Sequence, residues 1–494
     1  MQAIRLILKV LLFILLLIAC KNESYTDSVP ISPHISAVDG YVGSAACISC
    51  HSDAYDHWIG SHHDHAMKIA DSTTVIGDFN NINVIIDHIA YHFFKEDNRY
   101  KVRIKEIDNS EQTYTISYTF GIHPLQQYIV NFDKGRKQVL RVSWDALKKI
   151  WYHQYPGQVI SPDDWLHWTQ GAQNWNTMCA ECHSTNLKKN YNVEADSYLT
   201  TFSEINVACE SCHGPAQRHV NWAKAPGTDS TRYILRGITQ RDQMNLCAPC
   251  HARRSKLTPN LNPGESFHNQ YLLQNLSTDF YHGDGQIKEE DYVYGSFRQS
   301  RMYAEGVKCT DCHNAHSLEL RFEGNQLCTQ CHVPGEYDSK SHHFHQEQTE
   351  SALCINCHMT GETYMGNDFR RDHSFRVPRP DQSMVYDTPN ACTGCHEDKS
   401  DSWAANMIKT WYGPNRTAHF SDGLLLSSKT ELSNIQRQQV DVFISNFDIP
   451  DIARATLIEN LDFNTEQEFQ FLVKTLNDSS ALVRYQALTK LRNL

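Results

Sequence analysis

The sequence predicts a mainly α-helical fold with little regular structure over its central part, a small inserted antiparallel β-sheet, and α-helical repeats at its C-terminal end. Three observations support this prediction. The pattern Cys-x-x-Cys-His occurs eight times along the 494 residues. Apolar and polar residues alternate from residue 82 to residue 144, which favours β-strands, and apolar residues recur at helical spacing from residue 421 to residue 494. Loops rich in Gly, Pro, Asn and Asp separate the motifs, so the helices between them are expected to be short.

Cysteine usage points to a covalently attached cofactor. Two cysteines in each of eight motifs account for all but one of the 17 cysteines. Two thiols this close can form thioethers to one porphyrin, and the next histidine can ligate its iron, which is the pattern of c-type haem attachment. We therefore expect eight covalently bound haem c groups in a multihaem cytochrome c. The expected attachment cysteines are Cys47, Cys50, Cys179, Cys182, Cys209, Cys212, Cys247, Cys250, Cys309, Cys312, Cys328, Cys331, Cys354, Cys357, Cys392 and Cys395. The expected proximal ligands are His51, His183, His213, His251, His313, His332, His358 and His396.

Structural zinc is the alternative reading of these motifs, because Cys-x-x-Cys is also half of a zinc site. Zinc does not require a histidine directly after the second cysteine, yet all eight pairs have one. For a chain of this composition, chance predicts about 0.03 Cys-x-x-Cys-His motifs. The repeated histidine therefore favours haem.

The N-terminal end has the features of a secretory signal. Arg5 and Lys9 precede an apolar run over residues 10–18, which is short for a membrane span. A transmembrane anchor is the alternative, but the run ends in Leu-Ile-Ala-Cys, which resembles the lipobox of bacterial lipoproteins. That resemblance implies that residues 1–19 are removed as a signal peptide, that Cys20 is acylated, and that residues 20–40 form a lipidated tether.

Charge and compartment limit the possible partners. The formal net charge is −12, which argues against nucleic acid as a partner. The expected lipid anchor places the protein in a bacterial cell envelope, on the periplasmic side or at the outer membrane, and attaches it to the membrane. The partners are then expected to be redox proteins, either other cytochromes or a membrane complex that oxidises quinol.

The rest of the chain divides into four expected segments. Residues 41–80 carry the first motif and a histidine cluster expected on a helix. Residues 81–145 form the β-rich insertion, with Asp-Asn, Asn-Ser and Lys-Gly turns and a scaffolding role. Residues 146–420 carry the other seven motifs. Residues 421–494 contain two similar stretches thirty residues apart, which resemble HEAT-type helical repeats and are expected to pack on the haem-binding part.

Each haem that only transfers electrons needs a second axial ligand, and histidine is the expected one. More histidines remain than the eight irons require. We expect the ligands among those that lie near a motif or in polar, helix-compatible stretches. These candidates are His62, His63, His65, His153, His167, His219, His282, His316, His343, His345 and His373.

Three stretches of sequence resemble a known group of proteins. They are residues 174–183 (NWNTMCAECH), 209–219 (CESCHGPAQRH) and 306–316 (GVKCTDCHNAH). The chain resembles multihaem cytochrome c lipoproteins with C-terminal HEAT or tetratricopeptide repeats. The haem core of that group is similar to the superfamily of hydroxylamine oxidoreductase, octahaem tetrathionate reductase and cytochrome c nitrite reductase.

One departure from that superfamily concerns its reductases, which typically carry Cys-x-x-Cys-Lys at the catalytic haem. No such motif occurs here. Hydroxylamine oxidoreductase uses an ordinary Cys-x-x-Cys-His with a cross-linked tyrosine, so the missing lysine leaves catalysis open while disfavouring nitrite reduction.

The sequence leads to an electron carrier as the main hypothesis, in which bis-His haems relay electrons outside the cytoplasm. An enzyme that reduces or oxidises a small nitrogen or sulfur compound at one five-coordinate haem is the alternative. The compound would belong to the hydroxylamine, nitrite or tetrathionate class. A third hypothesis is a binding module whose repeats assemble a respiratory complex.

Basic and aromatic residues before the fifth and eighth motifs are the candidates for a catalytic pocket. Arginines in such an acidic chain need anionic partners, and the propionates of bound haems are the ordinary ones. We therefore favour propionate binding by these arginines over an anion pocket above an open haem. The residues are Arg298, Arg301, Tyr303, Arg370, Arg371 and His373.

Overall fold

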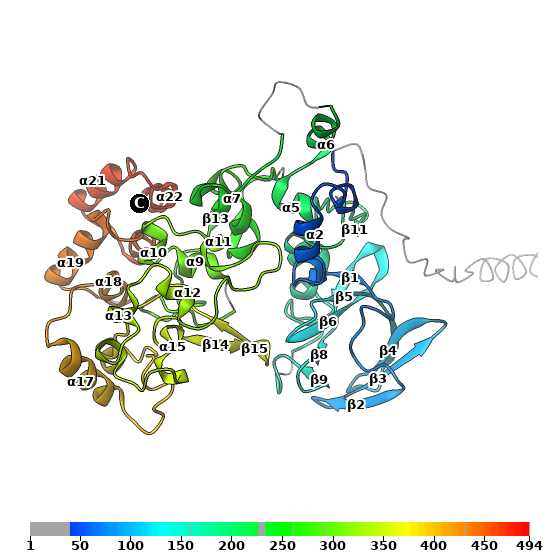
Figure 1. Ribbon diagram of the computed structural model, residues 1–494, viewed down its shortest axis with the longest axis horizontal. Helices are drawn as coiled ribbons and strands as arrows, with labels where there is room; N and C mark the ends of the chain where they lie inside the picture. Colours follow the sequence, from blue (N-terminus) through cyan, green and yellow to red (C-terminus); the bar gives the residue numbers. More distant parts are fainter. Residues whose placement is uncertain are drawn as a thin grey trace, which may run out of the picture. The chain divides into compact units, whose positions relative to one another are not determined.

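A computed structural model describes residues 40–158, 160–225, 233–259, 261–290, 292–429 and 431–493 (Figure 1). All of them belong to one compact unit. The expected signal peptide and the acylation site at Cys20 lie outside the described residues. Within the described ranges, no helix is long and apolar enough to cross a membrane.

The N-terminal half of the described chain builds an antiparallel sheet of nine strands, larger than the small sheet predicted from the sequence. The strands pair in the order β2-β3-β4-β5-β6-β8-β9, with β1 on β5 and β7 on β6. β2 also contacts β9, so the sheet is strongly curved. The strands are β1 (Lys68–Ile69), β2 (Ile82–Ile86), β3 (Ile89–Glu96), β4 (Arg99–Lys105), β5 (Glu111–Phe120), β6 (Leu125–Asn131), β7 (Lys137–Val139), β8 (Val142–Asp145) and β9 (Ile150–His153).

The sequence identified the long strands because their side chains alternate between two environments. In β4 the buried residues Tyr100, Val102 and Ile104 alternate with residues that are more exposed. Asp97 and Asn98 between β3 and β4 have φ values of 51° and 58°, which suits a tight hairpin turn. The sheet extends beyond the predicted 81–145 because β1 and β9 are too short to show a period. Strand β9 is fixed by packing instead, since Trp151 stacks on Phe93 with ring centres 3.7 Å apart.

Short helices follow the sheet, as the sequence predicted. The histidine cluster differs from the expectation, because the helix after the first motif ends at Trp58 and leaves His62 and His63 outside it. Gly60 follows at a φ of 79°. The helices are α2 (Ser52–Trp58), α3 (Trp175–Met178), α4 (Ala180–His183), α5 (Cys209–His213), α6 (Gln217–Lys224), α7 (Gln240–His251), α8 (Phe267–Gln270), α9 (Val293–Phe297), α10 (Arg301–Ala304), α11 (Cys309–Cys312), α12 (Gln326–Thr329), α13 (Pro334–Tyr337), α14 (Lys340–His343), α15 (Cys354–His358), α16 (Pro380–Tyr386) and α17 (Asp401–Tyr412).

Three two-stranded ribbons lie between these helices. They are β10 (Tyr191–Asn192) with β11 (Ser197–Tyr198), β12 (Arg254–Lys256) with β13 (Tyr271–Leu273), and β14 (Gly361–Tyr364) with β15 (Asp368–Arg371).

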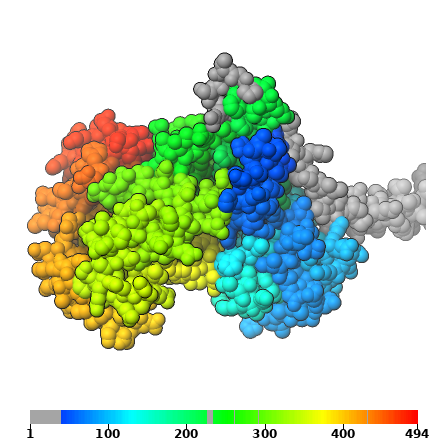
Figure 2. All heavy atoms as spheres, viewed as in Figure 1, coloured from blue at the N-terminus to red at the C-terminus, as the bar shows by residue number. Residues whose placement is uncertain are grey.

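The C-terminal segment is helical and packs on the central part, as expected from its apolar spacing. Its helices are α18 (Phe420–Ser427), α19 (Asn434–Ser445), α20 (Asp451–Asn460), α21 (Glu466–Thr475) and α22 (Ala481–Arg492). Helix α20 is buried along most of its length and shares one apolar core with Phe267, Tyr281 and Tyr294. In Figure 2 the orange and red C-terminal residues lie directly against green residues of the central part. The assignment of these helices to HEAT repeats stays a prediction.

Candidate haem sites

Each motif folds as a single helical turn. In the first, fifth and eighth motifs, the backbone N–H of the histidine donates to the carbonyl of the first cysteine at 2.9 Å, and in the sixth at 3.1 Å. In the third and seventh motifs, the five residues are helices α5 and α15. Side chains at positions i, i+3 and i+4 lie on one face of a helical turn. Both thiols and the imidazole of a motif therefore project from the same side, as attachment to one porphyrin requires.

Six motif histidines face a second histidine from elsewhere in the chain. The ring centres in these pairs are 6.1–6.5 Å apart. Most of the facing histidines lie near a different motif in the sequence, so the pairs bring distant parts of the chain together. The pairs are His51 with His219, His251 with His63, His213 with His316, His313 with His373, His358 with His342, and His396 with His345.

The spacing of these pairs fits an iron held between two imidazoles. A metal–imidazole bond is about 2 Å long and a ring nitrogen lies about 1 Å from its ring centre, so two axial histidines have ring centres about 6 Å apart. A zinc site requires a different arrangement. In the described ranges, no group of three or more His, Cys, Asp or Glu side chains is placed to hold a metal ion. The spacing of the facing histidine pairs therefore fits haem ligation.

Hydrogen bonds at the other ring nitrogen orient several of these imidazoles. Nδ1 of His358 donates to the carbonyl of Arg376 at 2.7 Å, and Nδ1 of His213 donates to the carbonyl of Leu235 at 2.9 Å. Nδ1 of His373 is likewise 2.9 Å from a backbone carbonyl. A proton on Nδ1 leaves the lone pair on Nε2 free, which is how proteins prepare histidine to bind a metal.

Burial keeps the imidazoles of His63 and His183 in the neutral form that binds metals. It is the main cause that lowers the pKa of His63 to about 4, and the neighbouring His251 adds to the shift. The same cause lowers the pKa of His183 to about 4. Both rings are therefore unprotonated at neutral pH.

Five of the eleven distal candidates face a motif histidine, namely His63, His219, His316, His345 and His373. The other six do not face one within the described chain, namely His62, His65, His153, His167, His282 and His343. Two of these bind other groups, because His153 Nδ1 lies 2.8 Å from Asp87 and His167 Nδ1 lies 2.8 Å from Thr169.

His342, which was not among the expected distal ligands, faces His358. It directly precedes the expected ligand His343 in the run Lys-Ser-His-His-Phe-His. The histidine that faces His358 is therefore one position before the one predicted. The histidine-rich run was the available signal. Which of its rings faces a motif depends on the ends of helix α14, and these are not evident in the sequence.

Two motif histidines have no facing histidine among the described residues. The ring nearest to His183 is that of Phe120, with centres 4.3 Å apart and an edge-on arrangement. The ring nearest to His332 is that of Tyr337, with centres 5.5 Å apart and also edge-on. The second and sixth motifs therefore differ from the other six.

Neighbouring motifs approach one another closely enough for their thiols to interact. Four pairs of thiols from different motifs lie within hydrogen-bonding distance of each other. Further pairs are close enough for their charges to interact. The first set is Cys47 with Cys209, Cys182 with Cys250, Cys247 with Cys309, and Cys328 with Cys354; the second is Cys212 with Cys247, Cys312 with Cys331, and Cys357 with Cys392.

These interactions, four between neighbouring thiols and three between charges, connect all eight motifs into one network. From one interacting pair to the next, the path runs through the first, third, fourth, fifth, sixth, seventh and eighth motifs. The second motif joins this path at the fourth, through Cys182 and Cys250. The order of the motifs in this network thus differs from their order in the sequence. In the sequence, the sheet lies between the first and second motifs.

The candidate catalytic residues are not brought into one site. Arg298 is buried, where its guanidinium pairs with Asp451 and donates to the hydroxyl of Tyr294 at 2.8 Å. Tyr303 packs with its ring centre 5.3 Å from that guanidinium. Arg301 lies at the surface and pairs with Glu305 at 2.8 Å.

The remaining candidates also have protein partners. Arg370 pairs with Asp368 at 2.7 Å and with Glu290 at 3.1 Å. Arg371 donates to the carbonyls of Ile355 and Met359 at 3.1 and 3.0 Å, so it binds the helical turn of the seventh motif. His373 faces His313, as described above. These contacts indicate structural positions for Arg298, Arg370 and Arg371.

Two protein-family models match parts of the chain. The family described as cytochrome c554 and c-prime matches residues 165–214, which include the second and third motifs. The doubled CXXCH motif family matches residues 302–337, which include the fifth and sixth motifs. No curated protein sequence matches the chain.

Two solved structures are similar to the chain. The outer cell wall cytochrome OcwA is 18% identical, with a TM-score of 0.53 over 92% of this chain and 100% of that chain. This similarity extends over both the sheet and the haem-binding part and concerns the fold. The octaheme sulfite reductase MccA of Wolinella succinogenes is 14% identical, with a TM-score of 0.32 over 92% of this chain and 84% of that chain.

Proposed function

We propose that this multihaem c-type cytochrome transfers electrons outside the cytoplasm through eight covalently bound haem c groups, six of which have histidine on both sides of the iron. The six facing histidine pairs carry the proposal. An iron with two strong axial ligands has no position for a substrate, and it changes little on reduction, so it is suited to electron transfer.

The contacts between motifs support a continuous path for electrons. Electron tunnelling slows steeply with distance, so cofactors must lie nearly in contact for a fast relay. The thiols of Cys247 and Cys309 meet between the fourth and fifth motifs, and those of Cys328 and Cys354 meet between the sixth and seventh. Porphyrins attached at these cysteines would have neighbouring edges close together.

Two measurements test the proposal. The intact mass of the secreted protein should show eight haem increments, and fewer than seven would contradict it. The oxidised protein can then be mixed with less than one electron equivalent of reductant. We expect redistribution of the electron among the haems at a rate that is independent of protein concentration. A rate proportional to protein concentration would mean transfer between molecules and not along one chain.

A second candidate function is the reduction or oxidation of a small nitrogen or sulfur compound at an open haem. One observation favours this candidate: neither His183 nor His332 faces a histidine within the described residues. A haem ligated there only from the proximal side could bind an external ligand. Carbon monoxide should then bind to two haems of the reduced protein. If it binds none, and nitrite, hydroxylamine and tetrathionate are not turned over, this candidate fails.

The proposed location is the outside of a bacterial cell, with attachment through a lipid on Cys20. Covalent haem attachment and the fold shared with a cytochrome of the outer cell wall support a place outside the cytoplasm. The proposed partners are other cytochromes or a quinol-oxidising complex, with the C-terminal HEAT-like helices as a docking surface.

A further inference from the structure

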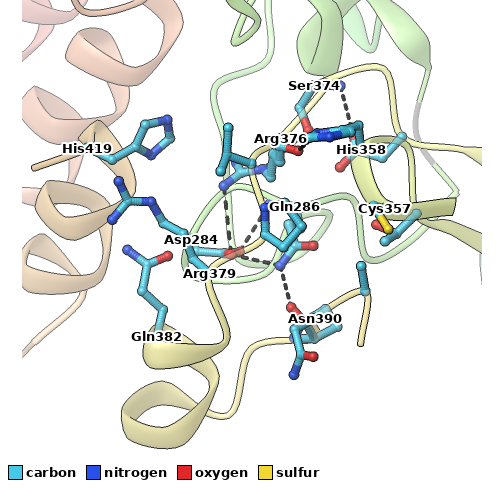
Figure 3. Close-up of a pocket in the computed structure, with 16 residues that line it drawn as sticks. Asp284, Gln286, Cys357, His358, Ser374, Arg376, Arg379, Gln382, Asn390 and His419 are labelled. Atoms are coloured by element: carbon cyan, nitrogen blue, oxygen red, sulfur yellow. Dashed lines mark hydrogen bonds and ion pairs between the residues drawn. The ribbon is translucent and has the colours of Figure 1, made fainter. Parts of the chain in front are cut away.

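A pocket beside the seventh motif contains arginine side chains that have no role in the proposed haem attachment or axial ligation. Figure 3 shows Arg379 and His419 on one side of this pocket, Cys357 and His358 on the other, and Arg376 between them. The segments that meet here are the loop after β15, the start of helix α16 and the start of helix α18. The pocket thus connects a haem attachment site with the C-terminal helices.

The arginines of the pocket donate to neutral acceptors, Arg376 Nη2 to Gln299 Oε1 at 2.8 Å and Arg379 Nη2 to the carbonyl of Thr417 at 2.6 Å, while their carboxylate partners are more distant. Arg376 Nη1 lies 3.7 Å from Asp284, and Arg379 Nη1 lies 3.8 Å from Asp422. Both distances are long for a charge-assisted hydrogen bond, which is normally 2.7–2.9 Å in proteins, as an approximate range. The guanidinium groups are nevertheless mostly buried, with 13% and 14% of the side chains exposed. Buried and loosely paired cations favour the binding of an anion.

A third arginine adds positive charge beside this pocket, which Asp284 and Asp372 also line. Arg416 Nη2 donates to the carbonyl of Pro378 at 3.0 Å, and no described carboxylate forms an ion pair with it. Burial, followed by the charges of the three arginines, lowers the pKa of His419 to about 3. The imidazole is therefore neutral at physiological pH, chiefly because it is buried, and the charges of the arginines add to the shift in its pKa.

The pocket is also coupled to the seventh motif through the backbone. The carbonyl of Arg376 accepts the hydrogen bond from His358 Nδ1, while its guanidinium extends toward Asp284. One residue thus orients the imidazole proposed to ligate iron and contributes a charge to the pocket. Cys357, an expected attachment point, lines the same space.

We propose that Arg376 and Arg379, with Arg416 beside them at Pro378, form a carboxylate-binding pocket that holds a propionate of the porphyrin attached at the seventh motif. The proposal rests on the haem attachment proposed above at Cys354 and Cys357. A tethered carboxylate has a high effective concentration at the pocket, which favours it over an anion from solution. An oxyanion from solution could bind the same arginines, so the test distinguishes a haem propionate from a free oxyanion.

The test compares Arg379→Gln and Arg416→Gln in the haem-loaded protein, with Arg301→Gln as the matched control because Arg301 is exposed. Midpoint potentials are measured spectroelectrochemically at constant pH in a chloride buffer. Removing a positive charge near a propionate favours ferric over ferrous iron. We expect a negative shift in the potential of one haem in each pocket variant, partial recovery in Arg379→Lys, and no shift in the control. If Arg379→Gln does not fold, Arg416→Gln alone decides, since its only described bond is to one carbonyl.

A free oxyanion gives a different pattern. The potentials of the wild type would then change on addition of sulfate at constant ionic strength, and Arg416→Gln would remove this dependence. Potentials that equal those of the control in both variants, with no sulfate dependence, would overturn the pocket. A missing haem at the seventh motif, detected by peptide mass, would instead contradict the proposed attachment.

Discussion

The imidazole rings of His342 and His358 face each other with centres 6.1 Å apart and only 14° between their planes. His358 belongs to the seventh motif, and His342 lies on helix α14, sixteen positions earlier in the chain. Tyr412 holds this helix in place, because its hydroxyl donates a hydrogen bond to the carbonyl of His342. The pair therefore depends on three segments that are separate in sequence.

Replacing His342 should open the coordination of one haem. His342→Ala removes the ring that faces His358, so we expect one low-spin haem to become high-spin, with an increase in the high-spin signal of the electron paramagnetic resonance spectrum. His343→Ala is the matched control because the ring of His343 faces no motif histidine. A high-spin signal from His343→Ala and none from His342→Ala would show that the ligand is His343.

Arg371 should stabilise the helical turn of the seventh motif through its hydrogen bonds. Its guanidinium binds the carbonyls of Ile355 and Met359 and the side-chain oxygen of Asn356, all at 3.0–3.1 Å. Hydrogen bonds from a charged, partly exposed group suggest that Arg371→Gln lowers the free energy of unfolding by about 1–2 kcal/mol. Denaturant unfolding measures this, with Arg301→Gln as a control that should change it little. Equal stabilities of the two variants would contradict the role of Arg371.

His268 should make the packing of the C-terminal helices dependent on pH. Burial, followed by the charge of Arg298, lowers its pKa from 6.5 to about 4. Nε2 of His268 lies 3.4 Å from Arg298 Nη1, which requires an unprotonated nitrogen. Because the folded pKa is the lower one, the stabilisation is complete above pH 6.5 and is lost as the pH falls toward about 4.

The size of this effect follows from the shift in pKa. Between pH 7 and pH 5, the loss of stability due to His268 should be about 2 kcal/mol. His268→Gln retains an acceptor for Arg298 and cannot titrate, so its unfolding free energy should fall less over the same range. Parallel pH profiles for the variant and the wild type would rule out His268 as the cause.

Cys20 should determine attachment to the membrane. Cys20→Ala removes the thiol that acylation requires, so we expect the variant to lose incorporation of a labelled fatty acid and to accumulate as an unprocessed or released protein. Labelling of Cys20→Ala at the wild-type level would contradict a lipid anchor at this position.

The sequence predicted features that depend on local spacing. The positions of Cys309, Cys312 and His313 fit one helical turn, and this spacing is visible in the sequence. The pairing of His51 with His219 joins positions far apart in the chain, and no local pattern encodes it. The sheet was underestimated for a related reason, because strand β9 owes its place to the packing of Trp151 on Phe93.

The roles of the arginines depended on partners that the sequence could not place. Arg298 was expected to bind a haem propionate, with an anion pocket as the alternative, and in the structure Asp451, at the start of helix α20, pairs with it. Arg379 and Arg416 were not selected from the sequence, although Arg379 lies at the end of the basic stretch that starts at Arg370. The structure places Arg379 in a pocket with Cys357 and His358 of the seventh motif, and Arg416 binds the carbonyl of Pro378, which lines the same pocket.

The spin states of the oxidised haems test the central claim most directly. We would record the electron paramagnetic resonance spectrum of the full-length, fully loaded protein and quantify it against the total haem content. The facing pairs predict low-spin signals from six haems, and the positions of His183 and His332 predict high-spin ferric signals from two. High-spin signals from more than two haems, or low-spin signals from all eight, would contradict the account.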